Sequence, residues 1–158
     1  MHHLAEVLQE RGQLQEAEKL YRQVLLSRRA SPGDSHPDTL SSMHDLATLL
    51  VKREQFGEAE ELFREELEKR RRDKLGDEHA DTMSSISDLA TLLKEKEEWK
   101  EAEQLFCEKL LCGQSVHGTQ HKETITATKK LAKFLKATSS NPRIFKLGGA
   151  SLRNVSGR

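Results

Sequence analysis

The chain repeats itself with a period of 42 to 43 residues, and this repetition limits its possible folds more than any other feature. The segment Asp-Leu-Ala-Thr-Leu-Leu occurs at 45–50 and again at 88–93, and Glu-Ala-Glu occurs at 58–60 and at 101–103. Weaker copies lie one period before and one period after this pair. A period of about 20–50 residues is typical of arrays in which each unit buries its apolar face against the next. The sequence therefore predicts a repeat array.

Each unit is predicted to contain two helices joined by a short turn, because apolar residues recur at spacings of three and four. The second unit shows this most clearly, with helices expected at 37–53 and 56–72. Corresponding pairs are expected at 4–11 and 14–29 and at 80–96 and 99–111, followed by a lone helix at 122–137. The predicted units are about 1–35, 36–78 and 79–120, with a capping helix at 121–137 and a basic, disordered tail at 138–158.

Turn and capping residues set the expected ends of these helices. Ser35, followed by Pro37 and Asp38, is predicted to cap the first helix of the second unit with its side chain. Residues 113–120, which begin with a glycine, are predicted to form a loop. The lone last helix is expected to carry four apolar residues: Ile125, Leu131, Phe134 and Leu135.

Small and large residues stand at fixed places in each unit, in a pattern that resembles the tetratricopeptide repeat. In the second unit these places hold Leu46, Ala47, Leu50, Ala59 and Phe63, and in the third they hold Leu89, Ala90, Leu93, Ala102 and Phe106. The long period and the Leu-Gly-x-x-His step at 75–79 are similar to the kinesin-light-chain or nephrocystin-3-like subgroup. The resemblance implies an all-α, right-handed superhelical solenoid of antiparallel helix pairs that acts as a protein-interaction module.

The sequence shows no motif of an enzyme: it has no glycine-rich phosphate loop, no HExxH and no Gly-x-Ser-x-Gly. Acids and bases balance at 26 each, which gives no attraction to nucleic acid or to an anionic membrane. Cys107 and Cys112, the only cysteines, are expected to be reduced thiols, as in a cytoplasmic protein. We therefore expect no catalysis, no cofactor, no metal, and no nucleic-acid, membrane or small-molecule partner.

Three groups of polar residues receive structural interpretations. His36, His79 and His121 occur once per unit and are expected to serve at helix starts, because stacked units hold equivalent atoms too far apart for one metal ion. The glutamates at 58–61 and 101–103 are expected to lie on outer helix faces beside bases at helical spacing. The basic run at 69–72 is interpreted as the cation-rich end of a helix, favourable at the negative end of its dipole.

A candidate binding face follows from the family resemblance, which implies that the first helix of each unit lines a groove. The residues opposite the apolar stripe would then face this groove. They are Ser41, His44, Asp45, Thr48 and Lys52 in the second unit; Ser84, Ser87, Asp88, Thr91 and Glu95 in the third; and Thr126, Lys129, Lys130 and Lys133 in the last helix. The subgroup commonly carries paired asparagines just before Leu-Ala, where this chain has other polar pairs. The groove is expected to be mildly acidic at first and basic at its C-terminal end.

Two functions remain open at this stage. In the first, an extended peptide lies in the groove, with its acidic groups near Lys129, Lys130 and Lys133 and its hydroxyls or bases near Asp45, Thr48, Asp88 and Thr91. In the second, the chain is a structural fragment of a larger motor-adaptor or nucleotide-binding sensor protein and has no ligand of its own. The polar faces would then simply be solvated.

Overall fold

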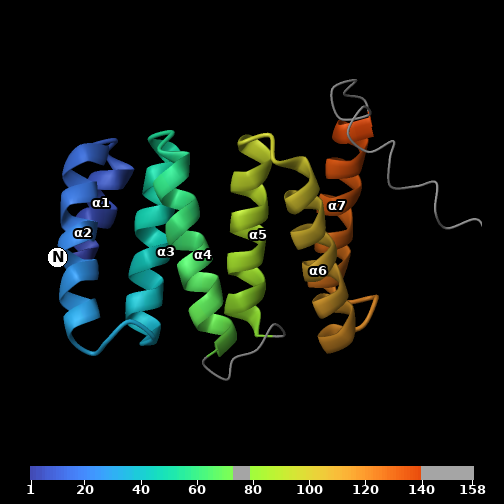
Figure 1. Cartoon of the computed structure of the whole chain (residues 1–158), viewed down its shortest axis with the longest axis horizontal. Helices are drawn as coiled ribbons and strands as arrows, with labels where there is room; N and C mark the ends of the chain where they lie inside the picture. Colours follow the sequence, from blue (N-terminus) through green and yellow to red (C-terminus); the bar gives the residue numbers. More distant parts are fainter. Residues whose placement is uncertain (73–78, 140–158) are drawn as a thin grey trace, which may run out of the picture.

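The computed structural model describes residues 1–72 and 79–139, and within these ranges the chain is helical apart from its turns. The described part contains seven helices: α1 (His2–Glu10), α2 (Leu14–Ala30), α3 (Pro37–Lys52), α4 (Phe56–Arg72), α5 (Ala80–Glu95), α6 (Trp99–His117) and α7 (Lys122–Ser139). They follow one another in chain order along the long axis of the molecule (Figure 1). The predicted all-α solenoid is therefore confirmed. The tail expected at 138–158 lies outside the described residues from residue 140 onward, as does the Leu-Gly step at 75–76.

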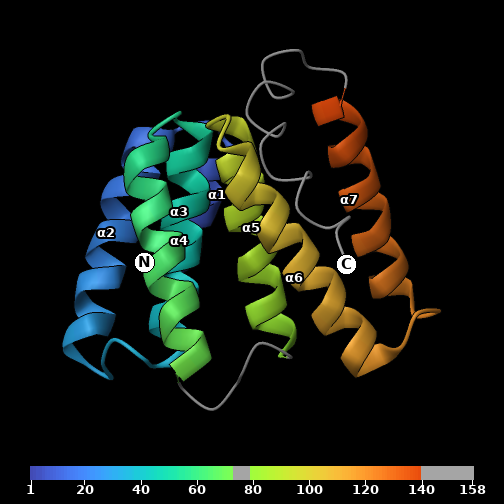
Figure 2. The same cartoon turned by 45° about the vertical axis from the view of Figure 1, so that its right-hand side comes forward.

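Each helix packs mainly against its neighbours in the sequence, from α1 on α2 through to α6 on α7. In the turned view of Figure 2, α6 crosses between α5 and α7. Alanines with no exposed surface allow the helices to approach closely, and they recur in every pair: Ala5, Ala17, Ala47, Ala59, Ala90 and Ala102. The rings of Tyr21, Phe63 and Phe106 are buried in this packing, as the repeated pattern predicts.

The turn between the two helices of a pair has the same backbone geometry three times. Gly12, Glu54 and Glu97 adopt the left-handed conformation with φ of 77°, 60° and 63°. The amide of the residue that follows donates a hydrogen bond to the carbonyl of the third-last helical residue. Gln55 N, for example, donates to Leu50 O at 2.9 Å. This is the Schellman closure of a helix, in which glycine is the preferred left-handed residue. Two of the three units use a glutamate there instead.

The first helix of the second and third units begins at a histidine. The ring Nδ1 of His36 accepts a hydrogen bond from the Asp38 amide, and Nδ1 of His79 accepts one from the Asp81 amide, each at 3.2 Å. The predicted helix-start role of these histidines is confirmed, whereas Ser35 is not the capping residue. His36 takes that place because it directly precedes Pro37, the first helical residue.

One expectation about the C-terminal helices is wrong. Helix α6 continues to His117, so Gly113 lies inside a helix instead of opening a loop. In α7, Phe134 is buried but Ile125 and Leu135 are 37% and 41% exposed. Within the described residues α7 packs chiefly on α6, which leaves these two side chains partly exposed.

Ion pairs connect the second helices of successive units at repeated positions. Arg22 on α2 contacts Glu58 on α4, with Nη2 2.7 Å from Oε2, and Arg64 on α4 contacts Glu101 on α6, with Nη1 2.7 Å from Oε1. A second series joins Arg29 to Glu65 and Arg71 to Glu108. The glutamates thus pair with bases one unit away as well as at helical spacing, which the sequence interpretation missed. Each of these side chains is about one-third to two-fifths exposed, so each pair adds little, about 0–1 kcal/mol.

Candidate functional site

The polar residues that precede each Leu-Ala pair contact one another from unit to unit. His2 Nε2 lies 2.8 Å from Asp45 Oδ2, His44 Nε2 lies 3.9 Å from Asp88 Oδ2, and Lys130 Nζ donates to Ser87 Oγ at 3.3 Å. In each contact the first residue of one polar pair meets the second residue of the next. We call these three contacts the polar ladder. It connects α1, α3, α5 and α7 in order.

His44 lies between two carboxylates at the centre of the ladder. Its Nδ1 is 3.4 Å from Glu66 Oε2, and the Glu66 carboxylate raises the pKa of His44 although burial works to lower it. Burial raises the pKa of Asp88, while the cations around it work in the opposite direction. A protonated His44 is therefore favoured here, because it compensates negative charge on both sides.

Behind His44 lies a fully buried ion pair. Glu66 on α4 has no exposed surface, and its Oε1 accepts hydrogen bonds from Arg70 Nε and Ser85 Oγ, each at 2.8 Å. Burial works to raise the pKa of Glu66, but the contacts with His44, Arg70 and Ser85 together lower it. Arg70 also reaches Asp81, with Nη1 3.4 Å from Oδ2. Charges from three helices thus meet at the α3–α4–α5 junction.

A cavity lies beside the ladder at each junction between units. The first, of about 510 Å³, lies between α1, α2 and α3 and is lined by His3, Glu6, Tyr21 and Asp45 among others. The second, of about 200 Å³, lies at the α3–α4–α5 junction beside Glu66 and Arg70. The third, of about 450 Å³, lies between α5, α6 and α7. Residues of first helices contribute to the lining of each cavity.

Thirteen of the fourteen predicted groove residues fall into two sets in the structure. Seven line these cavities: Ser41, His44, Asp45, Thr48, Ser84, Thr126 and Lys130. Six others are exposed or half-buried beside them: Lys52, Asp88, Thr91, Glu95, Lys129 and Lys133. Ser87 is the exception, because it is only 3% exposed and lies beneath Lys130.

Other polar residues contribute to this face without having been predicted. Glu66, Arg70 and Lys109 belong to second helices, whose residues the groove hypothesis did not consider. Arg70 stands in the basic run at 69–72, which was interpreted as the cation-rich end of a helix, and it is only 7% exposed. Its spacing of four residues from Glu66 was the one available signal.

The described residues contain one group with the geometry of a metal site: His2, His3 and Glu6, whose ligand atoms lie within 4.8 Å of one another. Ion pairing accounts for this group. His2 directs Nε2 to Asp45, and Glu6 accepts from His3 Nδ1 at 2.9 Å. Cys107 and Cys112 are half-buried and form no disulfide within the described residues, and burial raises the pKa of the Cys107 thiol. Across the described ranges, no helix has the length and apolar character needed to cross a membrane.

Helix pairs stacked in chain order, with the same turn and the same contacts in each, define an α-solenoid repeat protein. Two family models, each described as tetratricopeptide repeat, match residues 1–72 and 82–123. The chain belongs to the tetratricopeptide-repeat family. A search of curated proteins by sequence finds no significant match.

Solved structures of other proteins share this fold. A Podosopora anserina protein assigned as a kinesin light chain with nearly identical TPR-like repeats has a TM-score of 0.74 and 24% identity, covering 97% of this chain and 75% of that one. A variant of that protein gives a TM-score of 0.75, also at 24% identity, covering 96% and 74%. BtubC (BKLC) from P. vanneervenii has a TM-score of 0.74 and 22% identity, covering 91% of this chain and 56% of that one. The fold is thus that of kinesin-light-chain repeats.

Proposed function

We propose that this protein is a non-catalytic scaffold that binds an extended peptide along its first helices. The observation that carries the proposal is the row of three cavities beside the polar ladder, one at each junction between units. An extended peptide has polar groups at regular intervals, so it suits a face that offers polar cavities at regular intervals. The tetratricopeptide fold, which serves protein interaction, supports the same proposal.

Charge along this face gives the peptide a direction. Near α3 and α5, Asp45 and Asp88 provide carboxylates for hydroxyl or basic groups of the peptide, beside Thr48 and Thr91. Helix α7 instead carries exposed Lys129, Lys130 and Lys133, which would meet acidic groups. We infer an adaptor of the cytoplasm, consistent with two cysteines that form no disulfide within the described residues.

A second candidate is a purely structural array without its own ligand. The observation that favours it is that Asp45, His44 and Lys130 already contact partners in the neighbouring unit. These contacts reduce what each residue can offer a peptide.

Affinity capture followed by mass spectrometry would decide between these candidates. The groove variant Lys129→Glu with Lys133→Glu changes two exposed lysines of α7. The matched control, Lys19→Glu with Lys100→Glu, makes the same charge change on second helices, where both lysines are also exposed. We expect the groove variant to lose specific partners that the control retains. Equal partner sets for wild type and both variants would favour the structural array.

A further inference from the structure

Tyr21 on α2 carries a buried hydroxyl that the packing of the repeat does not require. The equivalent positions in the next two units hold Phe63 and Phe106, and the three residues are 2%, 2% and 6% exposed. The Tyr21 ring packs edge-to-face against His2, with 5.8 Å between the ring centroids. Within the described residues its hydroxyl makes no hydrogen bond. A buried polar group without a partner is uncommon in proteins, so this hydroxyl points to a role other than packing.

Tyr21 lines the cavity of about 510 Å³ between α1, α2 and α3. This volume lies within the range of about 300–1,000 Å³ that is common for pockets that bind small groups. A group that enters the cavity can therefore reach the hydroxyl.

Three carboxylates line the same cavity. Glu6 and Glu10 stand one turn apart on α1, and Asp45 belongs to α3. Burial, and then the charges of these three acids, raise the pKa of Tyr21 to about 12, so all three carboxylates act on its hydroxyl. Like charges one turn apart destabilise a helix, and a cation between them would relieve this repulsion.

The histidines beside the cavity compensate only part of this negative charge. His2 Nε2 lies 2.8 Å from Asp45 Oδ2, and Glu6 accepts from His3 Nδ1 at 2.9 Å. The side chain of Glu10 is exposed and makes no ion pair or hydrogen bond within the described residues. One carboxylate and the hydroxyl therefore remain available to a ligand.

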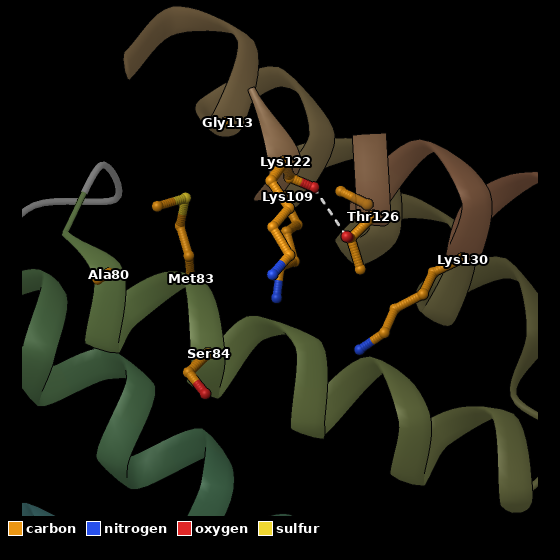
Figure 3. A pocket seen from close by; sticks show the side chains of 9 residues that line it. Ala80, Met83, Ser84, Lys109, Gly113, Lys122, Thr126 and Lys130 are labelled. Atoms are coloured by element: carbon orange, nitrogen blue, oxygen red, sulfur yellow. Dashed lines mark hydrogen bonds between the residues drawn. The ribbon is translucent and has the colours of Figure 1, made fainter. Parts of the chain in front are cut away.

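No lysine or arginine is among the described residues that line this cavity. His44 lines it too, but its ring nitrogens face the carboxylates of α4 and α5 described above. The cavity between α5, α6 and α7 has the opposite lining, because Lys109, Lys122 and Lys130 point into it (Figure 3). An acidic lining is thus particular to the α1–α2–α3 cavity and is not a general result of stacking the units.

The repeat supports this distinction. One period after Glu6 and Glu10 the chain has Thr48 and Lys52, and the residue one period after Tyr21 has no hydroxyl. The acids and the hydroxyl therefore occur together only in the first unit.

We propose that the cavity between α1, α2 and α3 binds a basic side chain, lysine or arginine, of the bound peptide. This inference rests on the proposed function and assigns one anchor point within it. Ammonium and guanidinium groups only donate hydrogen bonds, so they suit a site that offers carboxylates and an unused hydroxyl oxygen. The hydrocarbon stem of either side chain packs along Val7, which also lines the cavity.

Three Gly-Ser peptides that carry one arginine, one lysine or one citrulline would test the proposal. Citrulline has nearly the shape of arginine but lacks its charge. Amide chemical shifts of the protein are followed by NMR during titration with each peptide, which also measures weak affinities. We expect both basic peptides to bind, the citrulline peptide to bind weaker by about tenfold or more, and the amides of Glu6, Glu10 and Tyr21 to shift.

Tyr21→Phe is the decisive variant because it removes the hydroxyl without changing any charge. The other two units carry phenylalanine at this position, so we expect the variant to fold, and circular dichroism checks this. If the cation enters the cavity, Tyr21→Phe weakens binding by about tenfold, whereas attraction to an acidic surface would leave the affinity unchanged. Glu10→Gln should weaken binding to a similar extent. Glu61→Gln, which makes the same charge change at an exposed acid of α4, should not.

The outcomes separate this inference from the proposed function. An affinity unchanged by Tyr21→Phe, or shifts confined to α5 and α7, would overturn the cavity assignment and leave the proposed function standing. Equal affinities of the arginine and citrulline peptides would overturn the assignment of a cation. If none of the three peptides binds, the anchor point is wrong, and partner capture with the α7 variant judges the scaffold function separately.

Discussion

Glu66 and Arg70 lie one turn apart on α4 and form an ion pair from which solvent is almost excluded. Arg70 Nε is 2.8 Å from Glu66 Oε1, and the two side chains are 0% and 9% exposed. Glu66→Ala would leave the Arg70 guanidinium buried beside a void. We expect it to lower the free energy of unfolding by about 3–5 kcal/mol, measured by urea denaturation. Glu61→Ala, which removes an exposed glutamate of the same helix, should change it by less than about 0.5 kcal/mol. A loss below about 1 kcal/mol for Glu66→Ala would contradict this account.

The pH dependence of stability should report on His44. Its folded pKa is raised above the unfolded value of about 6.5, so its stabilising contribution is complete below that pH and is lost as pH rises through the folded pKa. The pKa of Glu66 is lowered, so its contribution is present above its unfolded value and is lost as pH falls through the folded pKa. The stability difference between wild type and His44→Gln should therefore shrink from mildly acidic to alkaline pH in denaturation curves.

Titration of His44 by NMR would identify which acid acts on it. Glu66→Gln should lower the pKa of His44, since burial then acts with less opposition. Asp88→Asn should lower it less, because Asp88 Oδ2 is 3.9 Å away and Glu66 Oε2 is 3.4 Å away. The reverse order of the two effects would assign the main interaction to Asp88.

The left-handed glutamates of the turns offer a way to stabilise the array. Glu54 and Glu97 have φ of 60° and 63°, where a side chain is strained and glycine is not. Glu54→Gly and Glu97→Gly should each raise the free energy of unfolding by about 0.5–1 kcal/mol, as seen by thermal or urea denaturation. Glu54→Ala keeps the strain of a Cβ and should bring no such gain. Stabilisation by alanine equal to that by glycine would show that charge, not backbone conformation, is responsible.

Phe134 attaches α7 to the rest of the array. Its ring centroid lies 5.3 Å from that of Phe106 and 6.0 Å from that of Trp99. Because Phe134 is 3% exposed, Phe134→Ala should cost about 3–5 kcal/mol locally. Hydrogen exchange should then become faster across α7 while α3 remains protected. Leu135→Ala, at a 41% exposed neighbour, should leave both helices protected. Equal acceleration in α3 would mean that the array unfolds as one unit.

The residues that repeat from unit to unit predicted the fold, because the same packing recurs in each unit. Ala47 and Ala90 recur since only a small residue lets two helices approach there, and His36 and His79 recur as helix starts. Gly113 was wrongly predicted to open a loop, because glycine commonly ends a helix and no neighbouring residue indicated that this helix continues. The run at 69–72 is the end of α4, as predicted, but the burial of Arg70 was not predicted, because burial at a junction depends on the next unit.

The candidate site was predictable only in outline. Helical geometry placed His44 and Asp88 on one side of their helices, yet it gave no information on their distance from each other. The contact between them depends on how successive units are rotated, which is a property of the whole stack. The cavity between α5, α6 and α7 was likewise not predictable from the pattern of one helix, because residues of different helices line it: Lys109 from α6, and Lys122 and Lys130 from α7.

Packing that is confined to chain neighbours has a consequence for how such a protein can change over generations. A substitution at the α5–α6–α7 junction alters contacts there and leaves the α1–α2–α3 junction as it was. One period apart, Arg70 and Glu66 at the α3–α4–α5 junction correspond to Gly113 and Lys109 at the α5–α6–α7 junction. Such a difference between junctions can arise without a compensating change elsewhere. Each junction can therefore vary on its own. The array can acquire a new binding site at one junction while the packing at the other junctions keeps it folded.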